Sequence, residues 1–248
     1  MMRGLLHLTW LELKIFVREP MGAAGTVLMP ALAFLGASLA GNSIAPTRFG
    51  ASEFARVGLP VLAAMLTAVS AVLSLVTIIA VYREGGILKR LRATPLRPHT
   101  IVLAHVLVKL LLTTVTLVIL SLLGRRVVAP VPGASLAGFA LALLFSTAAI
   151  LSLGFLMASV VRTARFAQPF GALVLYPMLA FSGVFVPVEA FPDWLQRVSR
   201  LLPLTRAVSL LQGAWLGESW LAHIGDVVAL TAFAGLSALV AARVFRWE

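Results

Sequence analysis

Residues 82–98 have the sequence YREGGILKRLRATPLRP, a basic stretch that lies between two long apolar runs. The consecutive glycines Gly85 and Gly86 predict the end of a helix that arrives from the first run, because glycine is common where helices end. Residues 87–93 are expected to form a short helix that stops before Pro95, since the residue preceding a proline avoids helical dihedral angles. The pattern therefore predicts a long helix, a short charged connector and a second long helix.

The composition indicates a membrane protein. Of the 248 residues, 60% are hydrophobic and 12% are charged, and the mean hydropathy is +1.02. Uncharged runs longer than about 18 residues are typical of membrane-spanning helices rather than of a soluble core. The formal net charge of +11 is attributed to residues that flank the membrane near anionic headgroups, and not to a nucleic-acid partner. The absence of cysteine excludes disulfides and thiolate metal sites.

The expected fold is an all-α membrane protein with six transmembrane helices, in one domain over residues 1–248. Residues 1–19 are charged and amphipathic, so they are expected to lie along the membrane surface as an interfacial helix. Basic residues favour a topology in which both termini are cytoplasmic. The fifth span contains Pro169 and Pro177 and is a candidate for an irregular helix. The spans are expected at about residues 21–41, 55–82, 100–123, 135–161, 166–181 and 220–242.

The connector has a pattern suited to docking on another protein. Leu88 and Leu91 share a face of the short helix, and Lys89, Arg90 and Arg92 cover its other sides. A basic connector is also common in cytoplasmic loops of membrane proteins that have no partner there. The pattern of charges alone leaves both interpretations open.

The order of residues in the string EGGILKRLRATPL, residues 84–96, resembles the first cytoplasmic loop of ABC-2 type transporter permeases, especially the daunorubicin-exporter and nodulation-exporter branch. In that family the loop carries a coupling helix that docks on a separate ATPase subunit. The tripeptide Arg18-Glu19-Pro20 resembles the short motif before the first span, and it implies an N-terminal interface. The resemblance implies ATPase coupling through Arg83, Glu84, Gly85, Leu88, Lys89, Arg90, Leu91, Arg92, Thr94 and Pro95.

Residues 181–217 differ from the rest of the chain, because prolines divide them into pieces too short to cross a bilayer. Residues 194–202 and 205–216 are helix-like, and they are expected to form an outer re-entrant hairpin before the last span. The segment resembles the outer hairpin of the ABC-2 family, in which S-G-x-x-x-P, P-x-W-L-Q and P-L-T recur. Many relatives have Asp and Arg where this chain has Ser209 and Gln212, which puts a salt bridge at those positions in doubt.

Three ionisable residues inside the expected spans are candidates for contact with a translocated substrate. His105 and Lys109 are four residues apart and share a face of the third span. The alternative is that Lys109 extends to the headgroups, as lysine can near a span end. Asp226 lies in the outer part of the last span, where a cap or a water-bridged contact is the alternative to a substrate role.

The chain has no phosphate loop of the form G-x-x-x-x-G-K-[ST], and it has no H-E-x-x-H or G-x-S-x-G motif. It is therefore not expected to be an enzyme or to hold a cofactor, and ATP and Mg²⁺ are expected on the partner ATPase. The resemblance implies the permease subunit of an exporter in the cell (inner) membrane, in contact with lipids and paired with itself or a similar permease. An intramembrane lipid-modifying enzyme and a passive membrane scaffold are the alternatives. The sequence does not define the cargo, which is expected to be hydrophobic, lipid-linked or drug-like.

Overall fold

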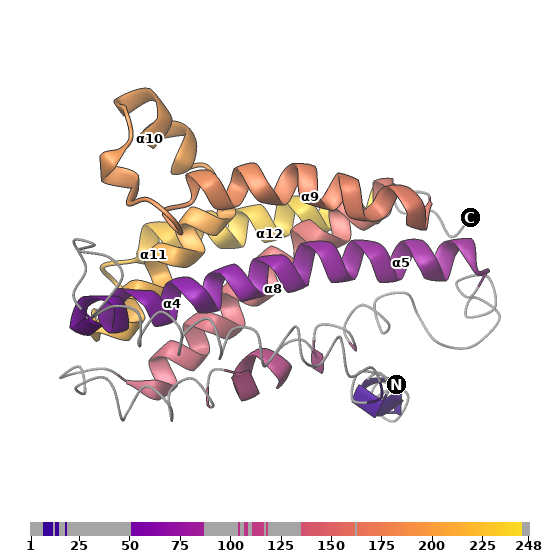
Figure 1. The fold of residues 1–248 in the computed structure, drawn as a ribbon, viewed down its shortest axis with the longest axis horizontal. Helices are drawn as coiled ribbons and strands as arrows, with labels where there is room; N and C mark the ends of the chain where they lie inside the picture. Colours follow the sequence, from indigo (N-terminus) through magenta and orange to yellow (C-terminus); the bar gives the residue numbers. More distant parts are fainter. Residues whose placement is uncertain are drawn as a thin grey trace.

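The computed structural model describes residues 51–86, 135–161 and 163–244, with shorter pieces at residues 7–11, 13–14, 18, 104, 107–108, 111–116 and 118. Every regular element in this part of the chain is a helix, which confirms the all-α class. Figure 1 shows an elongated bundle whose long helices run roughly along its longest axis.

One long helical segment covers the expected second span. It consists of α4 (Ala51–Val69), the π-helical turn η2 (Ser70–Ser74) and α5 (Leu75–Glu84). The residues on either side of η2 keep helical dihedral angles, so the chain passes through the turn without a break. The helix α9 (Ala164–Phe181) packs closely against this turn, because a Cβ atom on Gly171 would lie only 3.0 Å from Cδ2 of Leu73.

Three helical stretches in the described part are long and apolar enough to cross a bilayer: Pro60–Glu84, Ala137–Val160 and Ile224–Val244. They correspond to the second, fourth and sixth expected spans. The expected first span, at residues 21–41, lies outside the described residues. The described pieces of the expected third span are helical.

Two further long helices of the described part are α8 (Leu136–Val160) and α12 (Ile224–Val244). Ser135 caps the start of α8, since its Oγ accepts a hydrogen bond from the Gly138 N–H at 3.2 Å. α8 contacts α4, η2, α5, α11 and α12, which makes it the central helix of the described bundle. Its buried side chains pack against alanines and branched aliphatic residues of these neighbours, and the small residues allow the backbones to approach closely.

Between α9 and α12 the chain forms the 3₁₀ turn η3 (Val188–Ala190) and two short helices, α10 (Asp193–Ser199) and α11 (Pro203–Leu216). The bounds of these two helices agree within a few residues with the helix-like pieces expected at residues 194–202 and 205–216. Gly217, with φ of +78°, ends α11 in a left-handed conformation that glycine adopts without strain. Figure 1 shows α10 and the start of α12 at the end of the bundle opposite to the end of α5.

The helix α9 is continuous through Pro169 and Pro177, which differs from the irregular helix expected for the fifth span. Each proline removes one backbone N–H and crowds the preceding turn. Prolines are tolerated in helices of membrane bundles where neighbouring groups satisfy the freed backbone atoms.

Candidate functional site

The end of α5 is bound to the connection between α8 and α9. Nη1 of the buried Arg83 donates a hydrogen bond to the carbonyl oxygen of Val161, the residue that follows α8. Oε2 of Glu84 accepts a hydrogen bond from the backbone N–H of Ala164, the first residue of α9, at 2.9 Å. Two consecutive residues of α5 therefore hold the two helix ends that meet in this connection.

The charges of Arg83 and Glu84 match the helix ends that they contact. The C-terminal end of a helix has free carbonyl groups and a partial negative charge, whereas the N-terminal end has free N–H groups and a partial positive charge. Arg83 binds a carbonyl oxygen at the C-terminal end of α8, and Glu84 binds an N–H group at the N-terminal end of α9. A hydrogen bond to a charged group typically contributes about 1.5–3 kcal/mol, and less where water screens the charge, as at the exposed Glu84.

The helix α5 ends at the consecutive glycines, as the sequence predicts. Gly85 N–H donates to the Val81 carbonyl oxygen at 2.9 Å, and Gly86 has φ of +67°. A residue with a side chain would be strained in that left-handed conformation. The helix α5 thus ends directly after the two residues that hold the α8–α9 connection.

The structure describes only some of the residues that the sequence predicts to be functional. Arg83, Glu84 and Gly85 are described, and Arg18 is helical and exposed. The proposed roles of the others stay predictions, because these residues lie outside the described part: Glu19, Pro20, Leu88, Lys89, Arg90, Leu91, Arg92, Thr94, Pro95, His105 and Lys109.

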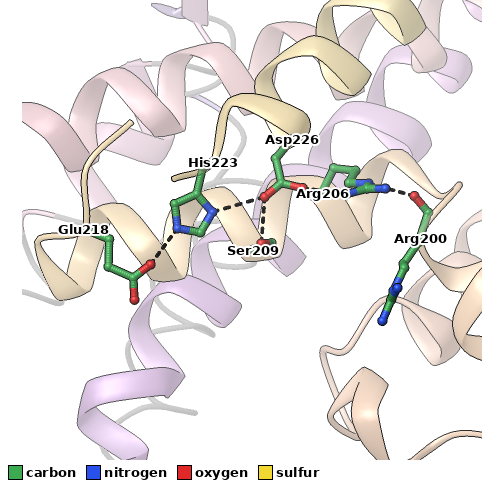
Figure 2. A network of polar contacts seen from close by, with 6 residues as sticks. All are labelled: Arg200, Arg206, Ser209, Glu218, His223 and Asp226. Atoms are coloured by element: carbon green, nitrogen blue, oxygen red, sulfur yellow. Dashed lines mark hydrogen bonds and ion pairs between the residues drawn. The ribbon is translucent and has the colours of Figure 1, made fainter. Parts of the chain in front are cut away.

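Asp226 is held by polar contacts that join α11 to α12, and Figure 2 shows them converging on its carboxylate. Oδ1 accepts a hydrogen bond from Arg206 Nη1 at 2.9 Å, and Oδ2 accepts one from Ser209 Oγ at 2.8 Å. Nδ1 of His223 lies 3.1 Å from the same Oδ2. Asp226 is only 7% exposed, so these contacts replace water around a buried charge.

His223 lies between two carboxylates. Its Nε2 is 2.8 Å from Oε2 of Glu218, while its Nδ1 faces Asp226. A neutral imidazole has one N–H donor only, whereas the protonated ring donates to both carboxylates. Burial lowers the pKa of His223, but the hydrogen bonds and charges of Glu218 and Asp226 outweigh burial and raise the pKa above its ordinary value of 6.5.

The imidazole of His223 packs directly against Gly213 of α11, where there is no room for a side chain. A Cβ atom at position 213 would overlap the ring, so any larger residue there would displace it. Arg206 is also fixed from its other side, because its Nε donates to the Arg200 carbonyl oxygen at 2.7 Å. The network is therefore held by close packing as well as by charge.

The role predicted for Asp226, contact with a substrate, stays a prediction, and its partners Arg206, Ser209 and His223 were not predicted from the sequence. Two features of the sequence could have indicated these partners. A carboxylate near a span end needs polar partners, and the short connection at residues 217–223 places α11 beside α12. The sequence put a salt bridge at Ser209 and Gln212 in doubt, and the structure has an ion pair beside Ser209 instead. The ion pair is formed by Arg206 and Asp226, and Ser209 is a neutral donor to it.

A cavity of about 600 Å³ lies beside this network. It is lined by the loop that follows α9, by Arg200 after α10, and by one face of α11. Thr205 in this lining is 8% exposed, and its hydroxyl has no hydrogen-bond partner within the described residues. In the same part of the chain, no group of three or more His, Cys, Asp or Glu side chains is placed to hold a metal ion.

A family model described as "ABC-2 type transporter" matches residues 3–216. The chain belongs to the ABC-2 type transporter family. The match covers the expected coupling connector, α9 and α11, and it ends before α12. The resemblance inferred from the connector and the hairpin is thereby confirmed. The three apolar helices of the described part agree with a multi-pass membrane protein of this family.

Among curated proteins, this ABC-2 protein is similar to "Nodulation protein J" of Neorhizobium galegae, with 36% identity over 70 residues. The alignment covers 28% of this chain and 27% of that protein. The chain therefore spans about a quarter of the length of this curated relative. The match itself agrees with the nodulation-exporter branch suggested by the connector.

Proposed function

We propose that this ABC-2 protein is the permease subunit of an ATP-driven exporter, and that residues 82–98 dock on a separate ATPase that binds ATP and Mg²⁺. The observation that carries this proposal is the contact of Arg83 and Glu84 with the α8–α9 connection. It fixes the start of the connector to two helix ends. A force applied to the connector would therefore act on α5, α8 and α9 together, instead of bending a free loop.

In the proposed cycle, closure of the ATPases pushes on the connector and shifts the end of α5. Glu84 moves with α5 and takes the N-terminal end of α9 with it. The first, second and fifth spans then shift at the interface with a second copy or a similar permease. The exposed Phe166, Leu173 and Tyr176 of α9 support this arrangement, because they give the helix an apolar surface for a partner subunit or lipid.

The proposed topology has six spans in the cell (inner) membrane, with both termini in the cytoplasm. The described helices alternate as this topology requires, since α5 ends and α9 begins at one end of the bundle, and α12 ends there too (Figure 1). The short helices α10 and α11 belong to the opposite, outer side. A hydrophobic, lipid-linked or drug-like cargo would leave the cytoplasm or the inner leaflet toward that side.

Docking can be tested by purifying the permease with the ATPase that a neighbouring reading frame encodes, recognised by its phosphate loop. The variant Leu88→Asp/Leu91→Asp is expected to lose the ATPase, because two charges replace the apolar face of the connector helix. Leu221→Asp is the matched control, since Leu221 is an exposed leucine at the other end of the bundle. Undiminished ATPase recovery with the double variant would contradict docking at this connector.

Transport is tested separately by reconstituting the permease with its ATPase in vesicles. ATP-dependent efflux of a hydrophobic probe is expected with the active ATPase and not with a variant ATPase that cannot hydrolyse ATP. A passive scaffold would bind the ATPase and give the same probe movement in both preparations. That result would overturn the assignment as an exporter subunit.

A further inference from the structure

The cavity beside the Arg206–Asp226 pair contains polar groups that the fold itself does not use. In the described part of the chain, the side chains of Glu189, Thr205 and Gln212 have no hydrogen-bond partner, although all three line the cavity. Thr205 is the most informative of them, because an unpaired polar group that is more than nine-tenths buried costs free energy unless something binds it.

Arg200 also belongs to the lining of the cavity. Its guanidinium makes one long contact, with Nη2 at 3.5 Å from Oε1 of Gln196. Figure 2 shows its side chain pointing away from the Arg206–Asp226 pair, so it does not belong to that network. Most of the donors of the Arg200 guanidinium therefore remain free for a ligand that reaches this lining residue.

The charges that line the cavity restrict what it can bind. Two cations, Arg200 and Arg206, and two anions, Glu189 and Asp226, are present in the lining. Arg206 and Asp226 form an ion pair at 2.9 Å, so Arg200 and Glu189 are the lining charges that have no ion-pair partner among the described residues. A ligand with only a negative group would leave Glu189 without a partner in the same cavity, whereas a zwitterion satisfies both charges.

The surroundings of the cavity favour an amphiphile. The cavity lies where α9 ends and α12 begins, at one end of a membrane bundle, which is the depth of lipid headgroups (Figure 1). Phe185 and Leu201 are exposed on the segments that supply the lining, and Trp194 is exposed on the adjoining α10. Exposed aromatic residues are common at this depth. Its volume falls within the range of about 300–1,000 Å³ that is typical of small-molecule sites.

We propose that this cavity binds the zwitterionic headgroup of a membrane lipid. The phosphate of the lipid lies on Arg200 and its ammonium group on Glu189, while the Thr205 hydroxyl and the Gln212 amide supply the neutral hydrogen bonds. Phosphatidylethanolamine has this chemistry, with one phosphate and an ammonium group that donates three hydrogen bonds. The acyl chains follow the exposed apolar side chains of the rim. This binding needs neither the ATPase nor a cargo, so it can fail while the exporter assignment stands, and the reverse.

The test uses the full chain purified in detergent, with lipid binding measured by native mass spectrometry. The probes are phosphatidylethanolamine and phosphatidylglycerol with identical acyl chains. Arg200→Gln and Glu189→Gln are each expected to weaken phosphatidylethanolamine binding about tenfold, because each removes a charge-assisted hydrogen bond. Thr205→Val is expected to weaken it about threefold. Arg197→Gln is the matched control, since Arg197 is on α10 but outside the cavity lining, and it is expected to change nothing.

A further arm separates the lipid from its free headgroup. Soluble glycerophosphoethanolamine is expected to bind far more weakly than the lipid, because it lacks the chains that contact the rim, and equal binding would overturn the assignment to a lipid. Where a variant does not fold, the unaltered protein decides. It is expected to retain phosphatidylethanolamine in preference to phosphatidylglycerol from an equimolar mixture. No preference, or an undiminished affinity of a folded Glu189→Gln variant, would overturn the proposal.

Discussion

The ion pair of Arg206 and Asp226 is expected to hold α11 against α12, and a double-mutant cycle measures its contribution. Arg206→Gln leaves Asp226, whose side chain is 9% exposed, with Ser209 and His223 as its partners. Asp226→Asn keeps the shape of the side chain and removes its charge. Arg206, whose side chain is 31% exposed, can then be hydrated, so this second change is expected to cost less.

The magnitudes follow from this difference in burial. Removing one partner of a fully buried ion pair costs about 3–5 kcal/mol. Because Asp226 keeps two other contacts, we expect Arg206→Gln to lower the free energy of unfolding by about 2–3 kcal/mol. We expect about 1–2 kcal/mol for Asp226→Asn. The double variant is expected to lose about 1–2 kcal/mol less than the sum, as found for residues in direct contact.

The free energy of unfolding can be measured on the full-length protein by titrating SDS into detergent micelles while circular dichroism follows the helix content. Arg197→Gln combined with Asp226→Asn is the matched control, because Arg197 is an exposed arginine on the neighbouring α10 and is not a partner of Asp226. These two changes are expected to add within about 0.3–0.5 kcal/mol. Additivity within the same margin for Arg206 and Asp226 would refute the view that their contact joins the two helices.

Three further predictions concern both ends of the bundle. Glu84→Gln removes the charge from the N-terminal end of α9, so efflux per ATP hydrolysed should fall about two- to fivefold while ATPase recovery is unchanged. An unchanged efflux ratio would show that this contact does not transmit movement. Gly213→Ala is expected to lower the free energy of unfolding by about 1–3 kcal/mol, because its Cβ displaces the His223 ring. The control Gly225→Ala, which has open space around it, should be neutral or slightly stabilising. The pKa of His223 is raised, so its two carboxylate contacts stabilise the fold fully below pH 6.5 and are lost as pH rises through the raised pKa. The difference in unfolding free energy between wild type and His223→Gln should therefore shrink above pH 6.5, and a constant difference would contradict protonation of the ring.

The long helices could be predicted because an uncharged run of this length has few alternatives to a membrane-spanning helix. The expected spans at residues 55–82, 135–161 and 220–242 overlap closely with the three stretches that could cross a bilayer. The end of α5 was also predictable, since glycine has a direct effect on the backbone. The π-helical turn at Ser70–Ser74 was not, because no residue in it disfavours an ordinary α-helix and its packing against Gly171 depends on tertiary structure.

The candidate sites were less predictable, for two physical reasons. A lone carboxylate in an apolar segment is visible in the sequence, so Asp226 could be singled out, but its ion pair could not. Its partners Arg206 and Ser209 come from another helix, whose rotation about its own axis is set by packing rather than by local sequence. At the other end of the bundle, Arg83 and Glu84 bind backbone atoms at two helix ends, and such atoms have no side-chain signature to recognise.

The helix α9 connects the two ends of the molecule physically. The N–H of its first residue is bonded to Glu84, and the residues that follow its end, Ser182 and Gly183, line the cavity. Gly171 keeps its middle in close contact with η2, so α9 is supported by the α4–α5 segment along its length. Under the two proposals, a shift at the end of α5 reaches the cavity through one continuous helix of 18 residues. Because linkage between two sites is reciprocal, a lipid that binds one position of α9 more tightly would resist the same shift, and ATPase binding would in turn change the affinity for that lipid.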